Sequence, residues 1–138
     1  MFPKKNKARQ PRKIARRETF SHNEKRITVC VELEPVSTMQ ALRQASEAIE
    51  DTEKALVASP ADEALQEAYG RAVLELFACA LGRDNVDRLL DLYGADLGDF
   101  MRDVKRFVFG VVLPAAKNAE ARELKRGRTG TGWRWSNA

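Results

Sequence analysis

Large apolar residues concentrate in residues 62–114 and recur there at helical spacing. They form three successive stripes, each of which fits one face of an α-helix. Breaks at Gly82 and Gly94 separate the stripes, and glycine is the residue that most often ends a helix. Three consecutive helices are therefore predicted, over residues 63–81, 84–92 and 97–116.

The last stripe contains its own interruption. Gly110 and Pro114 lie within it, and proline removes a backbone donor and crowds the preceding turn. We expect a kink or break there, after which the helix resumes to about Arg122.

An earlier, narrower stripe predicts a helix that ends near Val57. Ser37 or Thr38 is the expected N-cap of this helix, and Asp62 is the expected N-cap of the next. Gly70 lies inside the helix over residues 63–81, where glycine is unfavourable. It predicts the close approach of a neighbouring helix.

Residues 25–34 follow a different pattern, because apolar and polar side chains alternate. Ile27, Val29, Val31 and Leu33 share one face, and Pro35 ends the run, which reads as a β-strand. A lone strand leaves its backbone groups unpaired. It could pair with the same strand of another copy, with a partner protein, or with residues 17–22 as a hairpin. The remaining alternative is an extended segment packed on the helices.

These elements define the fold class as mainly α. We expect a small helical domain of four to five helices with one N-terminal β-strand or hairpin and flexible basic ends. The expected boundaries are a disordered basic arm over residues 1–24, a helical domain over 25–123, and a flexible basic tail containing tryptophan over 124–138.

Charge is strongly segregated along the chain, although the net charge is only +4. Residues 1–26 carry ten Lys/Arg against two acids, residues 27–116 carry eight against sixteen, and residues 117–138 carry six against two. The basic arm could bind nucleic acid or another polyanion, or it could be a solubilising leader. Its candidate polyanion-binding residues are Lys4, Lys5, Lys7, Arg9, Arg12, Lys13, Arg16 and Arg17.

Two tryptophans, Trp133 and Trp135, flank an arginine near the C-terminal end. Trp and Arg are the residues that most often anchor protein interfaces. They predict a docking motif, and the alternative is that the indoles fold back on the domain.

Catalytic and metal-binding patterns are missing from the sequence. His22 is the only histidine, no metal-ligand spacing is present, and no glycine-rich loop has the residues of a phosphate cradle. Serine and cysteine nucleophiles have no histidine partner in any recognisable pattern. The sequence therefore predicts a protein that is not an enzyme and needs no metal or cofactor.

Location is predicted from what the sequence lacks. Cys30 and Cys79 lie in apolar settings and are expected to be buried free thiols, as in a reducing cytoplasm. The basic N-terminus is followed by no apolar signal region, and no apolar run approaches ~20 residues. A cytoplasmic protein without membrane association is expected.

The order of motifs in residues 25–126 resembles that of small tail assembly chaperones of long-tailed phages and prophages. The resemblance lies in a helix that leads to LGRDN at 81–85, then LLDLY at 89–93, then a long helix with VVLP at 111–114 and a charged tail. A short strand ahead of the helices also matches. The basic arm and the Trp-containing end depart from the family pattern.

The resemblance implies a non-enzymatic chaperone that coats the tape measure protein during tail assembly in the host cytoplasm. It implies a homo-oligomer, with the tail tube protein as a further contact. A tape measure protein is a long helix with an apolar stripe, so its chaperone needs an apolar groove. The candidate groove residues are Tyr69, Val73, Phe77, Phe100, Val104 and Phe107, and the alternative, favoured for most of them, is that they form the core of the monomer. The alternatives are a small nucleic-acid-associated protein that binds through its basic arms, and a structural phage head or tail component.

Overall fold

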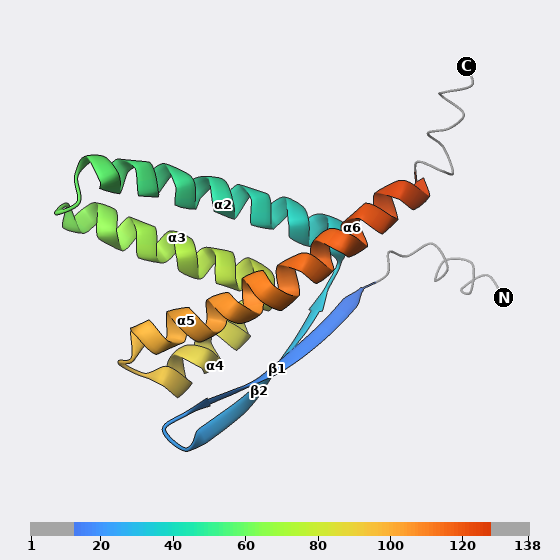
Figure 1. The fold of residues 1–138 in the computed structure, drawn as a ribbon, viewed down its shortest axis with the longest axis horizontal. Coiled ribbons are helices and arrows are strands. Elements are labelled where there is room, and N and C mark those ends of the chain that lie inside the picture. The colour runs from blue at the N-terminus through green and yellow to red at the C-terminus, as the bar shows by residue number, and fades with distance from the viewer. Residues whose placement is uncertain (1–12, 128–138) are drawn as a thin grey trace.

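The computed structural model describes residues 13–127, with side chains to residue 125. Within this range two antiparallel strands precede a series of helices (Figure 1). The mainly helical class with an N-terminal hairpin is confirmed. The elements are β1 (Ile14–His22), β2 (Lys25–Leu33), α2 (Pro35–Ala58), α3 (Glu63–Leu81), α4 (Arg83–Tyr93), α5 (Leu97–Phe107), the π-helical segment η1 (Val108–Val112) and α6 (Leu113–Gly127).

The predicted strand pairs within its own chain, as the second strand of a β-hairpin. Asn23 and Glu24 form the two-residue turn with φ values of 49° and 68°, which is the backbone that matches the twist of two paired strands. The register runs from Ile14 opposite Leu33 to His22 opposite Lys25. Of the alternatives that the sequence left open, the hairpin is the one observed.

The first strand corrects the expected boundary of the basic arm, since residues Ile14–His22 of that arm form β1. β1 carries Arg16, Arg17 and Glu18, and Phe20 is its only fully buried side chain among the residues described. Phe20 packs edge-on against Phe107 at a ring-centroid distance of 5.7 Å. The strand therefore forms because β2 supplies its hydrogen bonds and Phe107 of α5 supplies a packing surface for Phe20. Neither contact can be recognised from the composition of β1 itself.

Three of the four expected helix ends hold, and one of them is Gly94, which ends α4 with φ of 58°. Asp62 caps α3 by accepting hydrogen bonds from the backbone of Ala64 at 2.9 Å and of Leu65 at 3.2 Å. Gly82, with φ of 91°, ends α3 as expected. The N-cap of α2, however, is Glu34, which is followed by a proline at the first helical position.

Gly70 has an open environment, which contradicts the expected close helix contact. A Cβ placed on it would meet nothing within 4 Å, so no neighbouring helix requires glycine there.

The interruption in the last helix is a π-helical segment, whose turn is wider than that of an α-helix. The segment η1 separates α5 from α6 directly before Pro114, whose missing N–H and bulky ring disfavour regular α-helical bonding at that point. The expected break is therefore present as a π-helical turn. α6 runs to Gly127, so the first four residues of the expected flexible tail are helical.

The core lies where the base of the α2–α3 pair, α4, the α5–α6 rod and the hairpin meet (Figure 1). Phe77, Phe100 and Phe107 are each at most 1 % exposed. Residues 46–72, the outer halves of α2 and α3, contain no fully buried side chain. None of the helices in residues 13–127 combines the length and apolarity needed to cross a bilayer.

Candidate functional site

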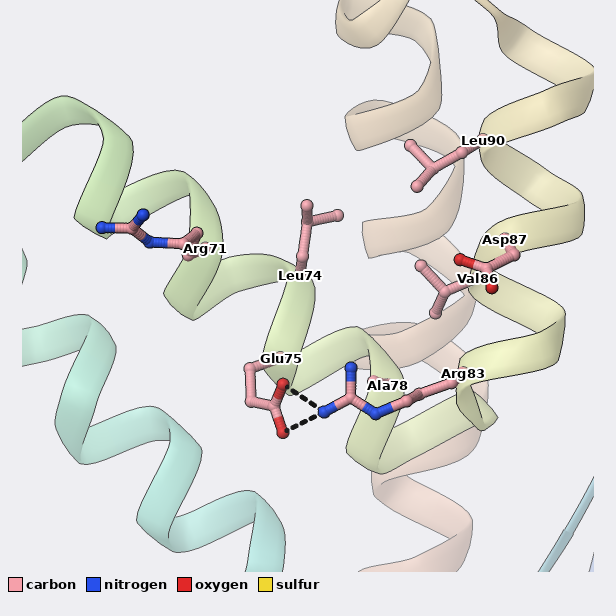
Figure 2. Close-up of a pocket in the computed structure, with 8 residues that line it drawn as sticks. All are labelled: Arg71, Leu74, Glu75, Ala78, Arg83, Val86, Asp87 and Leu90. Carbon is pink, nitrogen blue, oxygen red and sulfur yellow. Dashed lines mark hydrogen bonds and ion pairs between the residues drawn. The ribbon is translucent and has the colours of Figure 1, made fainter.

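A groove of about 350 Å³ lies between α3 and α4. Gly82 is the only residue between these two helices, and their axes separate directly after it. Side chains from both helices line the space between them (Figure 2). The apolar lining comes from two residues of α3 and two of α4, each pair one helical turn apart. These residues are Leu74, Ala78, Val86 and Leu90.

Charged side chains of both signs line the rim of this groove. Arg71 and Glu75 come from α3, and Arg83 and Asp87 come from α4. The Arg83 guanidinium donates to both Glu75 oxygens, at 3.0 and 3.2 Å (Figure 2). Both partners of this pair are more than half exposed, so it contributes little to stability and is free to rearrange around a ligand.

The groove has an apolar floor without a reactive group. Leu74, Ala78 and Leu90 are only partly buried against the core, so their outer surfaces remain accessible. The nearby Cys79 is half-buried, and burial, with a smaller effect from Glu75, raises the pKa of its thiol. A raised pKa makes a thiol a poorer nucleophile at neutral pH. The arrangement is therefore suited to binding.

The groove residues chosen from the sequence lie elsewhere. Val73, Phe77, Phe100, Val104 and Phe107 are at most 3 % exposed and form the core, so they do not line a surface groove. Tyr69 alone of the six keeps partial exposure, on the outer half of α3. Five of the six therefore fit the alternative interpretation, in which they form the core. The apolar faces of their helices pack against one another.

The residues that line the α3–α4 groove had a weak signal in the sequence. Leu74 and Ala78 each follow a core residue of α3 by one position, so the apolar surface of α3 is wider than one core-facing stripe. When the apolar face of a helix is wider than the area that packing against the core can bury, the remainder indicates a second contact surface.

The basic candidates divide between the hairpin and the undescribed arm. Lys13 lies 3.7 Å from Glu32, and Arg16 and Arg17 are exposed on β1. The other five, Lys4 to Arg12, and the tryptophans Trp133 and Trp135 lie outside the described residues. Cys30 is exposed on β2, which corrects the expectation that it is buried.

One other group of side chains in residues 13–125 has ligand-like geometry. The hairpin turn brings His22 next to Asp96 and Asp99, at the start of α5. Their separation in sequence hides this cluster from any analysis of local spacing.

Comparison with protein-family models, with curated proteins and with solved structures finds no match to this chain. The function is therefore proposed from the geometry of the described residues together with the motif order of the sequence.

Proposed function

We propose that this protein is a non-enzymatic assembly chaperone that binds an amphipathic helix of a partner protein in the α3–α4 groove. The open apolar floor between two helices, rimmed by charges of both signs, carries the proposal. A helix docked in such a groove buries apolar residues spaced three and four apart and leaves polar residues to meet the rim.

The resemblance of residues 25–126 to tail assembly chaperones supplies the partner. The tape measure protein of a long-tailed phage or prophage is a long helix whose apolar stripe needs cover until the tail tube encloses it. A homo-oligomer in the host cytoplasm would present several grooves along one such helix, and multivalent binding of this kind multiplies weak contacts. Each wall of the groove carries both signs of charge, with one Arg and one acid on α3 and one of each on α4, so the groove has partners for either sign of charge on the client.

Substitution of the groove floor tests the proposal. Leu74→Glu and Leu90→Glu each place a charge where the client's apolar stripe would dock, because both side chains are partly exposed in the groove. We expect the Kd for tape measure segments from the same phage to rise at least tenfold, which is about 1.4 kcal/mol. Co-purification of co-expressed segments and calorimetric titration of the purified protein would measure the loss.

Val57→Glu is the matched control. Val57 is 78 % exposed near the end of α2 and is not among the residues lining the groove, so the same change there should leave binding intact. Circular dichroism of all three variants shows whether the fold is retained. Equal binding by the wild type and by both folded groove variants would exclude the groove as the client site.

A second candidate function is polyanion binding by the hairpin, because Arg16, Arg17 and Arg26 are exposed on it. Nucleic acid bound through these side chains would raise the 260/280 absorbance ratio of the sizing-column peak at low salt and dissociate at high salt. A multimer free of nucleic acid at both salt concentrations would favour the chaperone.

A further inference from the structure

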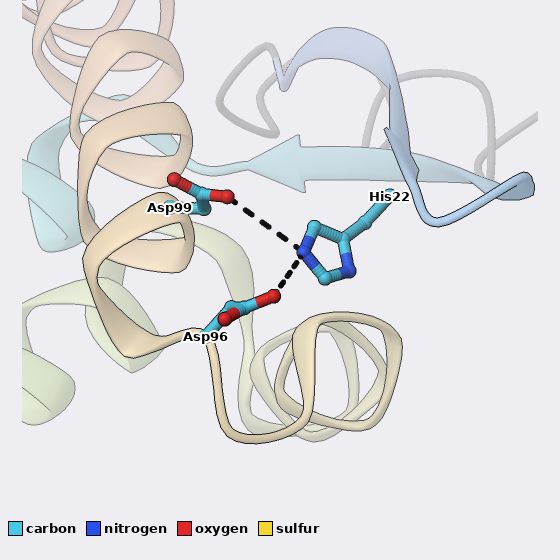
Figure 3. Close-up of side chains that lie close together, drawn as sticks. All are labelled: His22, Asp96 and Asp99. Atoms are coloured by element: carbon cyan, nitrogen blue, oxygen red, sulfur yellow. Dashed lines mark ion pairs between the residues drawn. The ribbon is translucent and has the colours of Figure 1, made fainter.

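His22, Asp96 and Asp99 converge at the junction of the hairpin and α5 (Figure 3). The Nε2 atom of His22 lies 2.7 Å from Oδ2 of Asp96 and 3.7 Å from Oδ2 of Asp99. Both carboxylates approach this one ring nitrogen, and the three atoms lie within 4.8 Å of one another. They come from segments that are far apart in sequence, so the fold alone assembles the group.

The imidazole is held in place and aimed at the two carboxylates. Its side chain is only 9 % exposed, and its ring centroid lies 4.8 Å from that of Tyr93. The other ring nitrogen, Nδ1, is buried and has no hydrogen-bond partner among the residues described. Within residues 13–125, the two aspartates are thus the only hydrogen-bonding partners of this ring, although buried polar groups are nearly always satisfied.

The carboxylates are oriented toward the ring and open to solvent. Asp96 occupies the N-cap position of α5, yet its side chain makes no capping hydrogen bond to the helix. An N-cap aspartate normally accepts a backbone N–H of the first turn. The Asp96 side chain is 57 % exposed and that of Asp99 is 47 % exposed, so an ion can enter and water can complete its coordination.

We propose that His22, Asp96 and Asp99 form a binding site for a divalent transition-metal ion such as Zn²⁺. Zinc bonds to histidine nitrogen and carboxylate oxygen at about 2.0–2.2 Å, which places tetrahedral ligands roughly 3.3 Å apart. The two observed separations from Nε2 lie on either side of that value. Small rotations of the two exposed aspartates would equalise them.

The donor set also selects the class of ion. Two carboxylates and one neutral imidazole balance a charge of +2, and an imidazole nitrogen favours zinc and its neighbours over Ca²⁺ and Mg²⁺, which prefer oxygen ligands. The bound ion would fasten the hairpin turn to the first turn of α5.

Two neighbouring features limit the affinity. Arg102 lies 3.3 Å from Asp99 and competes with the ion for that carboxylate. When Nε2 binds metal, the ring proton lies on Nδ1, which lacks the acceptor that supports most metal-binding histidines. Since such a partner is worth roughly 10–100-fold in affinity, we expect zinc to bind here more weakly by that factor than at a site whose histidine has an acceptor.

The test uses the full chain, free of metal and of any affinity tag, titrated with zinc chloride. His22 is the only histidine in the sequence, so a single imidazole gives all the histidine NMR signals. We expect these signals to shift and saturate at one equivalent of Zn²⁺, with the same stoichiometry by calorimetry. Unshifted histidine signals at millimolar zinc would overturn the proposal.

Variants of the exposed carboxylates locate the site without disturbing the buried ring. Asp96→Asn and Asp99→Asn should each weaken zinc binding at least tenfold. Asp91→Asn, an exposed aspartate of α4 outside the cluster, should bind as the wild type does. Cys30→Ser should also bind normally, which excludes the exposed thiol as the ligand. Undiminished zinc binding by both Asp96→Asn and Asp99→Asn would place the ion elsewhere and refute the assignment.

Discussion

The hydroxyl of Tyr93 offers a specific test of what holds α4 against α5. Tyr93 is 2 % exposed, and its hydroxyl donates a hydrogen bond of 2.6 Å to Oδ2 of Asp103. The Nε of Arg102 donates to the other carboxylate oxygen at 3.0 Å. Tyr93→Phe removes the first hydrogen bond and leaves the ring, its packing on Phe100 and the arginine contact in place.

The expected loss follows from the charge on the acceptor. A hydrogen bond to a charged group contributes about 1.5–3 kcal/mol, against about 1 kcal/mol for a neutral pair. The Asp103 side chain is 22 % exposed, so water can replace part of the lost bond. We therefore expect Tyr93→Phe to lower the free energy of unfolding at pH 7 by about 2 kcal/mol, and the melting temperature by roughly 8 °C.

The loss should depend on pH in a defined direction. Burial by itself would raise the pKa of Asp103, but the hydrogen bonds from Tyr93 and Arg102 outweigh it and hold that pKa below its ordinary value of 3.8. A depressed folded-state pKa stabilises the fold above the unfolded-state value, and this stabilisation is lost as the pH falls through the folded-state pKa. The difference in stability between the wild type and Tyr93→Phe should therefore begin to shrink as the pH falls below about 4, and should continue to shrink down to the folded-state pKa.

Urea unfolding followed by circular dichroism at pH 7, 5 and 3 would measure both effects. Tyr69→Phe is the matched control, because Tyr69 is the only other tyrosine and is partly exposed on α3. It should change stability by less than about 0.5 kcal/mol. A loss below that value for Tyr93→Phe, or an equal loss at pH 7 and pH 3, would refute the assigned role of the Tyr93–Asp103 bond.

Two further pairs of substitutions test the fold by urea unfolding. Gly70→Ala should stabilise the protein by about 0.5–1 kcal/mol, because the added methyl group meets no other atom there. Gly82→Ala should destabilise it by about 2 kcal/mol, because a φ of 91° is strained for alanine. Equal effects of the two substitutions would contradict this account. Arg43→Ala removes the partner of the Glu120 carboxylate, whose side chain is only 9 % exposed, and should lower the free energy of unfolding by more than the loss of a fully exposed pair does. Arg83→Ala breaks the exposed ion pair with Glu75 and should lower the free energy of unfolding by less than about 0.5 kcal/mol. A larger loss for Arg83→Ala would show that solvent exposure does not determine how much these ion pairs contribute to stability.

Local signals in the sequence determined most of the helices. α3 was predicted over its full length, because its apolar periodicity, the Asp62 cap and the Gly82 stop all act within a few residues of the chain. Proline and glycine likewise marked the irregular turn before α6. Capping, periodicity and backbone restriction are short-range effects, so the sequence displays them directly.

Prediction was wrong where a residue's role depends on a distant partner. The basic composition of β1 favoured disorder, but β2 supplies its hydrogen bonds and Phe107 supplies the contact for Phe20. Gly70 was assigned a close helix contact that the packing does not make. Burial depends on which stripes meet, and periodicity alone does not specify that pairing.

The same distinction separates the core from the candidate sites. The sequence determined that Val73, Phe77 and Phe100 lie on apolar helix faces, but only the packing of the helices made those faces the core and left Leu74 and Leu90 open in the groove. The cluster of His22 with Asp96 and Asp99 exists only because the hairpin turn lies against the start of α5. Side-chain chemistry is encoded residue by residue, whereas the proximity that turns it into a site is created by contacts between residues far apart in the chain.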